Sequence, residues 1–358
     1  MAASPEIARA RALLLRTLRD GLERRGYLEV ETPIAVPVAG QEPHLRPFET
    51  RFVPDLPVPP GGVEGARRLH LITSPEYAMK RLLARPGFPR IFQLARVFRD
   101  GEVSPAHNPE FTLLEFYAAP GDAALIMQHL EELVAECARA LNGSATAPAR
   151  APRSRGRTAI DLATPYERLS CREAFLRHAG FDPLTLDAEA LAQAARTVGV
   201  RPPPQASWDD VFTQILVHVV EPALGLSRPV YLTEYPASQA ALSRLKDSDP
   251  RVAERFELYA GALELCNGFT ELTDASEQRR RLLSEQAERA RLGRAVFPLD
   301  ERFLAALPQI SGAGGVAVGV DRLLMLLCGA ASIAEVLLFP AAEEYPAAPR
   351  ADREGDPA

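Results

Sequence analysis

The sequence has little cysteine, little lysine and no long apolar run. Its four cysteines, Cys137, Cys171, Cys266 and Cys328, are scattered and form no C-x-x-C pair. This spacing argues against a zinc site or a disulfide framework and predicts reduced, buried thiols, as in a cytoplasmic protein. No apolar stretch approaches the length that spans a membrane, and the charged N-terminus is unlike a signal peptide. We therefore expect no membrane partner.

Positive charge gives no sign of nucleic-acid binding. Lys80 and Lys246 are the two lysines, arginine supplies the remaining basic charge, and the formal net charge is -6. Without a basic excess, the composition does not predict an electrostatic surface for nucleic acid. With 358 residues, 47% of them apolar, the chain can bury a large core as one large or two modest domains.

A helix followed by a strand is expected at the N-terminus. Ser4-Pro5-Glu6 places a capping serine before a proline at the first helical position, which is typical of a helix start. Apolar residues then recur at helical spacing until Gly26, and residues 27–32 alternate as a strand that ends at Pro33. Similar patterns predict further helices over residues 77–83, 122–141, 171–179, 188–198 and 208–220.

Two apolar strands joined by a polar loop are expected over residues 90–117. Residues 91–98 and 111–117 are rich in β-branched and aromatic side chains. The segment between them is broken by Gly101, Pro105 and Pro109 and contains Arg99, Asp100, Glu102, His107 and Asn108. Polar groups held between two stiff strands favour ligand binding. An ordinary solvated turn is the alternative.

Three glutamates, Glu257, Glu264 and Glu271, are expected on one strand, where they lie among apolar residues. Burying carboxylates without cations is too costly, so we expect each to meet Mg²⁺ on a triphosphate or the ammonium group of a cationic substrate. Exposed glutamates at a sheet edge are the alternative.

Two further segments place polar or charged side chains at the expected start of a helix. Thr73-Ser74-Pro75-Glu76 precedes a helical segment, and residues 314–322 predict a glycine-containing strand that turns into an apolar helix. Alone, these patterns fit a plain helix N-terminus and a core strand–helix joint equally well.

Taken in order, these segments resemble the class II aminoacyl-tRNA synthetases of the lysine-activating type. F-R-D-G-E, H-N-P-E-F-T and E-F-Y in residues 98–117 resemble motif 2, residues 4–33 resemble motif 1, and residues 314–322 resemble motif 3. The resemblance extends from about residue 4 to residue 340. It implies an α+β fold in which an antiparallel sheet of six to seven strands is flanked by helices, in a homodimer with a motif 1 interface.

The resemblance also implies an ATP site with Mg²⁺. Arg99 would hold the α-phosphate and Arg322 the γ-phosphate, as the two catalytic residues, while Phe111 would stack on adenine. The remaining nucleotide residues would be Asp100, Gly101, Glu102, His107, Asn108, Glu264, Leu265 and Gly319, with Glu257 and Glu264 as metal ligands. The amino-acid site would comprise Ser74, Pro75, Glu76, Glu115, Tyr117, Asn267, Glu271 and Ala317.

Departures from lysyl-tRNA synthetases indicate a narrower family. Ser74 and Ala317 stand where those enzymes usually have alanine and glycine, P-A-S-Q-A follows at residues 236–240, and no room exists for an anticodon-binding domain before motif 1. The acid expected two residues after Arg99 stands one position later, at Glu102, after Gly101. These features are similar to the elongation factor P (R)-β-lysine ligases. That resemblance implies activation of (R)-β-lysine or lysine and its transfer to a lysine of elongation factor P, without tRNA.

We expect one catalytic domain over residues 1–342, a flexible insertion at about 142–157 and a disordered tail at 343–358. Two alternatives remain open: a truncated synthetase-like enzyme that charges another acceptor, and a non-catalytic nucleotide-binding paralogue. The second would be expected to lose Arg99, Arg322 or the glutamates, which this chain keeps.

Overall fold

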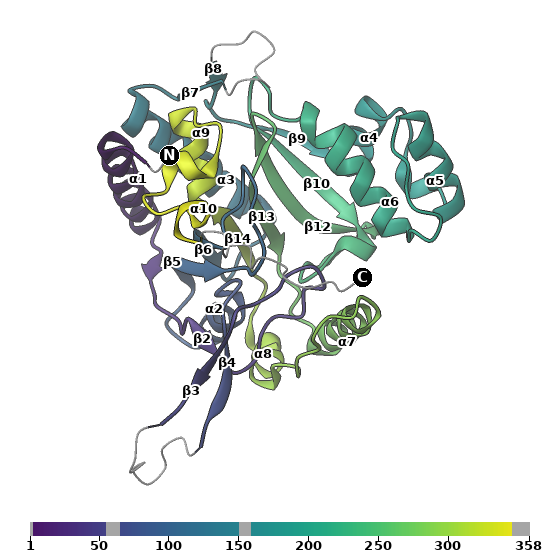
Figure 1. The fold of residues 1–358 in the computed structure, drawn as a ribbon, viewed down its shortest axis with the longest axis horizontal. Helices are drawn as coiled ribbons and strands as arrows, with labels where there is room; N and C mark the ends of the chain where they lie inside the picture. The colour runs from purple at the N-terminus through teal and green to yellow at the C-terminus, as the bar shows by residue number, and fades with distance from the viewer. Residues whose placement is uncertain (1–2, 55–64, 150–158, 346–358) are drawn as a thin grey trace, which may run out of the picture.

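The computed structural model describes residues 3–54, 65–149 and 159–345 of the chain. Within these ranges a nine-stranded sheet forms the centre of the molecule (Figure 1). Its strands, in spatial order, are β1 (Leu28–Glu29), β5 (Arg90–Phe98), β6 (Glu110–Ala118), β14 (Gly314–Gly319), β13 (Leu263–Thr270), β12 (Asp249–Ala260), β10 (Val230–Pro236) and β9 (Glu167–Ser170), with β11 (Leu245–Lys246) beside β12.

The six strands from β5 to β10 pair antiparallel, and β1 and β9 add parallel pairs at the two edges. The antiparallel sheet flanked by helices is therefore confirmed, with parallel edge strands as the difference. The edge strand β1 has two residues and lies within the strand expected over residues 27–32. The other edge strand, β9, has four residues, which is too short for its alternation in the sequence to reveal it. The three glutamates lie not on one strand but on β12, on β13 and just after β13.

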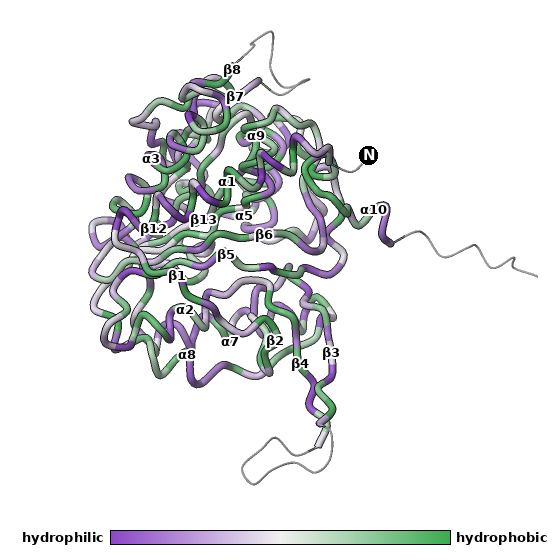
Figure 2. The backbone as a smooth tube through the Cα atoms, turned by 90° about the vertical axis from the view of Figure 1, so that its left-hand side faces the viewer, coloured by the Kyte–Doolittle hydropathy of each residue, from purple (hydrophilic) through white to green (hydrophobic). Residues whose placement is uncertain are grey.

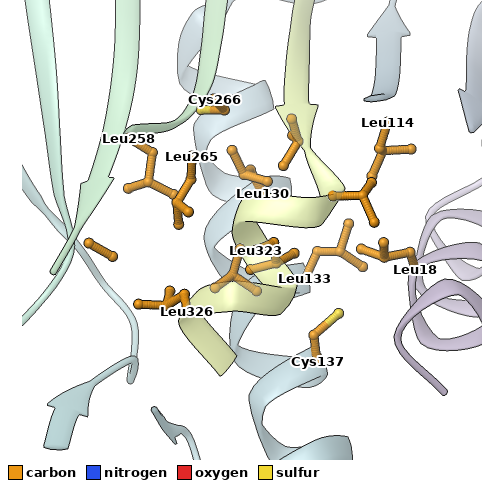
Figure 3. Packing of buried hydrophobic residues seen from close by; sticks show 14 of the residues in the cluster. Leu18, Leu114, Leu130, Leu133, Cys137, Leu258, Leu265, Cys266, Leu323 and Leu326 are labelled. Carbon is orange, nitrogen blue, oxygen red and sulfur yellow. The ribbon is translucent and has the colours of Figure 1, made fainter. Parts of the chain in front are cut away.

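Three helices cover one face of the sheet: α1 (Pro5–Arg24), α3 (Ala123–Asn142) and α9 (Val320–Cys328) (Figure 2). The Ser4 hydroxyl accepts a hydrogen bond from the Ile7 amide at 3.4 Å, and the Asp122 carboxylate caps α3 through the Leu125 amide at 2.9 Å. Leucines from these helices and the sheet meet in one core (Figure 3): Leu18, Leu114, Leu130, Leu133, Leu258, Leu265, Leu323 and Leu326. Each buried leucine contributes about 1.5–3 kcal/mol, so this core fixes the sheet from behind.

The second face carries α2 (Glu76–Leu83), α7 (Ala275–Arg291), α8 (Glu301–Ala306) and a small sheet in the order β2-β4-β3 (Figure 2). That sheet consists of β2 (Ala35–Val36), β3 (Glu49–Phe52) and β4 (Arg67–Leu71). A second apolar cluster from α2, α8 and β5 fills this layer. It leaves the central strands β6, β12, β13 and β14 partly open, and the candidate site lies there.

A third group of helices, α4 (Cys171–His178), α5 (Ala188–Thr197) and α6 (Trp208–Ile215), packs beside β10 and β9 around its own apolar cluster. The helices expected over residues 171–220 are therefore confirmed, with α6 continuing as a π-helical turn over Leu216–Val220. Short 3-10 segments lie between α4 and α5 (Pro183–Thr185), between the π-helical turn and β10 (Glu221–Ala223), and directly after β10 (Ala237–Gln239).

Two expectations about irregular segments are wrong in part. The first residues of the expected insertion form β7 (Thr146–Pro148), which pairs with β8 (Ala159–Asp161), because Gly143 ends α3 in the left-handed conformation and turns the chain back. The first two residues of the tail expected at 343–358 belong to the short helix α10 (Ala341–Glu344). The remainder of both predictions, residues 150–158 and 346–358, lies outside the described residues.

Cys137, Cys171 and Cys266 are buried free thiols, as expected, whereas Cys328 is only half-buried. Burial raises the pKa of the Cys328 thiol and, more strongly, that of the Cys266 thiol. Both thiols are therefore poor nucleophiles, and the chemistry of the chain must lie elsewhere. Among the described residues, no helix is both long and apolar enough to cross a bilayer.

Candidate active site

A cavity of about 380 Å³ lies over β6, β12, β13 and β14, between the hairpin loop at one end and α2 at the other. It brings together 17 of the 20 predicted site residues from segments as distant as residues 74 and 322. Pro75, Asp100 and Gly101 do not line it. The structure thus gathers the predicted residues around one space, and their individual binding roles stay predictions.

The Arg322 guanidinium organises the nucleotide end of the cavity. It donates to the Glu264 carbonyl at 3.0 Å, to Glu264 Oε2 at 3.2 Å and to His107 Nε2 at 2.7 Å. A guanidinium can only donate, so Nε2 must accept and Nδ1–H must donate to the Ser104 hydroxyl, 2.7 Å away. Burial, followed by the Arg322 charge, lowers the pKa of His107. The imidazole is therefore neutral at pH 7 and leaves Arg322 as the local cation.

Arg99 lines the same end of the cavity and lies directly after β5. Its guanidinium lies 5.0 Å from the centre of the Phe111 ring, and Nη1 is 3.8 Å from Glu102 Oε2. The buried Arg99 Nε atom has no hydrogen-bond partner among the described residues. Two guanidiniums and one aromatic face therefore border the same space, an arrangement suited to a triphosphate and a planar base.

Gly101 explains why the acid of this loop is displaced by one position. Gly101 has φ = 81°, a left-handed conformation that glycine adopts without penalty. This turn directs Asp100 outward, where its carboxylate pairs with Arg46 at 3.1 Å, and brings Glu102 to the cavity wall. If one acid of this loop reads the base, the geometry favours Glu102 over residues 100 and 101.

The two predicted metal ligands differ in how they fit Mg²⁺. The Glu264 side chain is 38% exposed, and its one recorded ion pair, with Arg322, leaves carboxylate oxygen facing the cavity. By contrast, Glu257 Oε2 accepts from the Tyr235 and Tyr259 hydroxyls at 2.5 and 2.6 Å, and Oε1 accepts from Arg255 at 2.6 Å. Glu264 therefore fits a metal on a triphosphate better than Glu257 does. Within the described ranges, no group of three potential metal ligands gathers.

The Asn108 side chain forms hydrogen bonds within the protein. Its Nδ2 donates to the Glu110 carbonyl at 2.7 Å, and its Oδ1 accepts from the Ala341 amide at 2.9 Å. The side chain is almost fully buried. This predicted nucleotide residue therefore braces the hairpin loop against the start of α10, in addition to lining the cavity.

Glu115 forms the base of the amino-acid end. It is fully buried on β6, where Oε1 accepts from the Ser74 hydroxyl at 2.6 Å and Oε2 accepts from the Tyr117 hydroxyl at 2.7 Å. Burial, followed by the charge of Glu76, raises the pKa of Glu115 to about 8. The serine of the Ser-Pro-Glu segment thus has a specific partner, which an alanine would not provide.

Glu271 lies beside Glu115 and is paired with Lys80. Lys80 Nζ is 2.5 Å from Glu271 Oε2 and 2.6 Å from Glu76 Oε1, and the lysine side chain is 0% exposed. Burial raises the pKa of Glu271 to about 7, with the Lys80 charge acting against that rise. Sequence reasoning missed Lys80, although its i,i+4 spacing from Glu76 on α2 was a visible signal.

Arg255 is the second residue that sequence reasoning missed. It donates to Asn267 Oδ1 at 3.1 Å, to Glu257 Oε1 at 2.6 Å and to the Gln239 carbonyl at 2.8 Å. It therefore joins the P-A-S-Q-A segment to the cavity and occupies the Asn267 carbonyl oxygen. Arg255 and Glu257 alternate on β12 and share one face, which is the signal that could have found it.

Gly315 and Ala317 form the floor of the cavity on β14. Their cross-strand partners on β6 are Tyr117 and Glu115, respectively. A methyl group at Gly315 would overlap both the Tyr117 ring and Glu271 Oε1. The absence of a side chain at Gly315 therefore keeps the approach to Glu271 open.

We expect the Gly315→Ala substitution to raise the KM for the amino-acid substrate by at least about tenfold, because the added methyl group competes with Tyr117 and Glu271 for the same space. The same overlap should lower the free energy of unfolding by about 1–3 kcal/mol. ATP affinity, measured by calorimetry, should stay within twofold, because Gly315 lies at the opposite end from Arg322. An unchanged amino-acid KM would show that the substrate does not approach this floor.

Comparison with known proteins is consistent with this geometry. The family model for tRNA synthetases class II (D, K and N) matches residues 2–343. The chain belongs to this family. Among curated proteins, the elongation factor P--(R)-beta-lysine ligase of Proteus mirabilis is 40% identical over 333 residues, which cover 92% of this chain and 93% of that protein. The protein of the same name from Salmonella typhi is 40% identical over 332 residues, with the same coverage. The predicted resemblance is thereby confirmed.

Proposed function

We propose that this protein activates (R)-β-lysine or lysine with ATP and transfers the acyl group to a lysine of elongation factor P. The observation that carries this proposal is the polarity of the cavity, with two guanidiniums at one end and buried carboxylates at the other. The names of relatives that are 40% identical over nearly their full length point to the same substrates.

In the first step the substrate carboxylate attacks the α-phosphorus of ATP, forming a C–O–P bond as the bond to pyrophosphate breaks. Arg99 and Arg322 stabilise the negative charge that develops on the phosphate oxygens, and catalysis is mostly positioning and charge stabilisation. Mg²⁺, held through Glu264 with Glu257 nearby, would neutralise the triphosphate. In the second step the acceptor amine attacks the acyl carbon, which releases AMP and a proton.

The ammonium groups of the substrate bind at the end of the cavity that carries the carboxylates. Glu76, Glu115 and Glu271 surround that end, and each is buried or nearly so. A substrate without a matching ammonium leaves a carboxylate unpaired in a poorly hydrated space, which costs more than a lost neutral contact. The site therefore rejects neutral side chains of similar length.

We further propose that the enzyme works as a homodimer in the cytoplasm and does not use tRNA. Leu13 on α1, Leu28 on β1 and Ile34 are 37%, 53% and 43% exposed. Apolar side chains that gather on the motif 1 segment support a protein interface there. The free cysteines and a translation factor as acceptor fit a reducing compartment.

Mass spectrometry of elongation factor P tests the proposal directly. Incubation with enzyme, ATP and each lysine isomer should add the mass of one lysyl residue to a single lysine, with (R)-β-lysine preferred. Parallel reactions with tRNA should give no aminoacyl-tRNA. Charged tRNA with unmodified elongation factor P would support the truncated-synthetase alternative, and a lack of pyrophosphate exchange with any isomer would support the non-catalytic one.

A further inference from the structure

Lys80 is fully buried, yet it does not line the cavity. It faces Glu76 on its own helix, Glu271 after β13 and Glu115 on β6, while the Phe303 ring of α8 lies 5.9 Å from Nζ. Burial lowers the pKa of Lys80, but the charges of Glu271 and Glu76 outweigh it and hold the pKa above its ordinary value. Lys80 is therefore a permanent cation behind the acidic wall.

The charges around this end of the cavity can be counted. When fully ionised, Glu76, Glu115 and Glu271 carry three negative charges and Lys80 carries one positive charge, which gives a net charge of -2. Burial raises the pKa of Glu115 to about 8 and that of Glu271 to about 7, so a substrate with two ammonium groups displaces the protons that the free wall holds at pH 7. Lysine and β-lysine each carry two ammonium groups, and their carboxylate belongs at the opposite end with the arginines. The net charge of the wall therefore matches the number of ammonium groups on a diamino acid.

The geometry points to Lys80 as a positioning residue that sets substrate specificity, because it pairs with Glu76 and Glu271, cancels one carboxylate charge and limits the fully ionised wall to a net charge that the two ammonium groups of a diamino acid neutralise. This inference rests on the proposed function and concerns how its substrate is chosen.

Lys80 also determines which carboxylate oxygens remain unpaired and available to the substrate. It pairs with Glu271 Oε2 and Glu76 Oε1. Glu271 Oε1 has no hydrogen-bond partner in the described part of the chain and lies beside the bare backbone of Gly315. The lysine thus holds the Glu271 carboxylate so that its open oxygen faces the approach that Gly315 leaves clear.

Removing the Lys80 charge should change how the wall titrates. Without the lysine, Glu76 and Glu271 repel each other and lose the cation that lowers the pKa of Glu271, so the pair holds a proton more tightly at neutral pH. Glu42 and Glu285, which face Glu76 from the neighbouring loop and from α7, add to that repulsion. A wall that protonates easily tolerates a missing substrate ammonium, so selectivity for two ammonium groups should fall.

The Lys80→Met variant tests this inference, with Lys246→Met as the matched control. Lys246 is the other lysine of the chain and pairs with Glu234 outside the cavity. Calorimetry of (R)-β-lysine binding in two buffers of different ionisation enthalpy gives the number of protons released. We expect Lys80→Met to release more protons at pH 7 than the unchanged enzyme, and its KM for (R)-β-lysine to titrate about one pH unit higher.

Selectivity gives a second measurement. The preference for (R)-β-lysine over the analogue that lacks the β-amine should fall about tenfold or more in Lys80→Met. The double variant Lys80→Met/Glu76→Gln removes one charge of each sign and restores the net charge of -2. It should therefore regain part of the lost preference, which a lysine with only a structural role would not allow.

Three results would overturn the inference: unchanged proton release in a folded Lys80→Met variant, an equal change in Lys246→Met, or no recovery in the double variant. If Lys80→Met does not fold, the double variant, compared with Glu76→Gln alone, still measures the charge effect. Failure of the proposed function is distinguishable, because it appears as absent exchange in the unchanged enzyme, while the binding measurements remain informative.

Discussion

The Glu271→Gln variant should lose amino-acid activation while keeping its affinity for ATP. Breaking a buried charge pair costs about 3–5 kcal/mol, and each 1.4 kcal/mol is tenfold, so kcat/KM for pyrophosphate exchange should fall by about two to three and a half orders of magnitude. Glu271 lies at the amino-acid end of the cavity with Lys80, far from the arginines that would hold the phosphates. Exchange kinetics with lysine and (R)-β-lysine, together with calorimetry of ATP, measure both quantities.

Glu167→Gln is the appropriate control for that variant. Glu167 lies on β9 and pairs with Arg177 at 2.9 Å, with both side chains 52% exposed. An exposed ion pair contributes about 0–1 kcal/mol, so this variant should exchange at the normal rate and unfold within about 1 °C of the unchanged enzyme. Normal exchange in Glu271→Gln would refute its role in binding the substrate ammonium.

Removing the Arg99 guanidinium should act on the chemical step instead. We expect Arg99→Ala to lower kcat for adenylate formation by about a hundred- to a thousandfold, the range seen when one donor to a developing oxyanion is lost. The loss of the contact with Phe111 should also weaken ATP binding by a smaller factor. Rapid-quench measurement of a single turnover separates the two effects.

Arg96→Ala provides the comparison on the same strand. Arg96 lies three residues earlier on β5 and is 44% exposed, and it pairs with Glu110 at 2.6 Å outside the cavity. Its loss removes a surface ion pair and should leave kcat unchanged. If Arg96→Ala and Arg99→Ala are equally impaired, the effect comes from disturbance of the hairpin, and the assignment of Arg99 to the α-phosphate fails.

The sequence motifs predicted the parts of the site whose functional side chains lie on one contiguous segment of the chain. Each of two units is continuous in sequence: the hairpin of β5 and β6, and the strand–helix joint of β14 and α9. The sequence alone therefore predicted that their side chains border one space, namely those of Arg99, Phe111, Glu115 and Arg322. The antiparallel sheet followed from the same resemblance.

Residues whose role depends on a distant partner could not be predicted in this way. Lys80 on an amphipathic helix has the pattern of a solvated charge, and only the fold brings Glu271 against it from 191 positions away along the chain. Arg255 likewise depends on Asn267 and on the carbonyl of Gln239. Asp321, within motif 3, accepts from the Thr112 amide at 2.7 Å and pairs with Arg11, so it ties three segments that no local pattern connects.

The hydrogen bonds of Asn108 bear on how a C-terminal truncation would affect the hairpin loop. The hairpin loop that faces the nucleotide is held from behind by the last described residues, through the Ala341 amide and through the Ile333 amide, which donates to the Pro105 carbonyl at 2.8 Å. The Ala3 amide in turn donates to the Leu337 carbonyl at 2.8 Å, so the first described residue of the chain is bonded to the same C-terminal segment. Truncation after residue 332 would therefore remove both hydrogen bonds to the hairpin loop, together with the buried side chains of Ile333, Val336 and Leu337, while every predicted site residue stays in the chain.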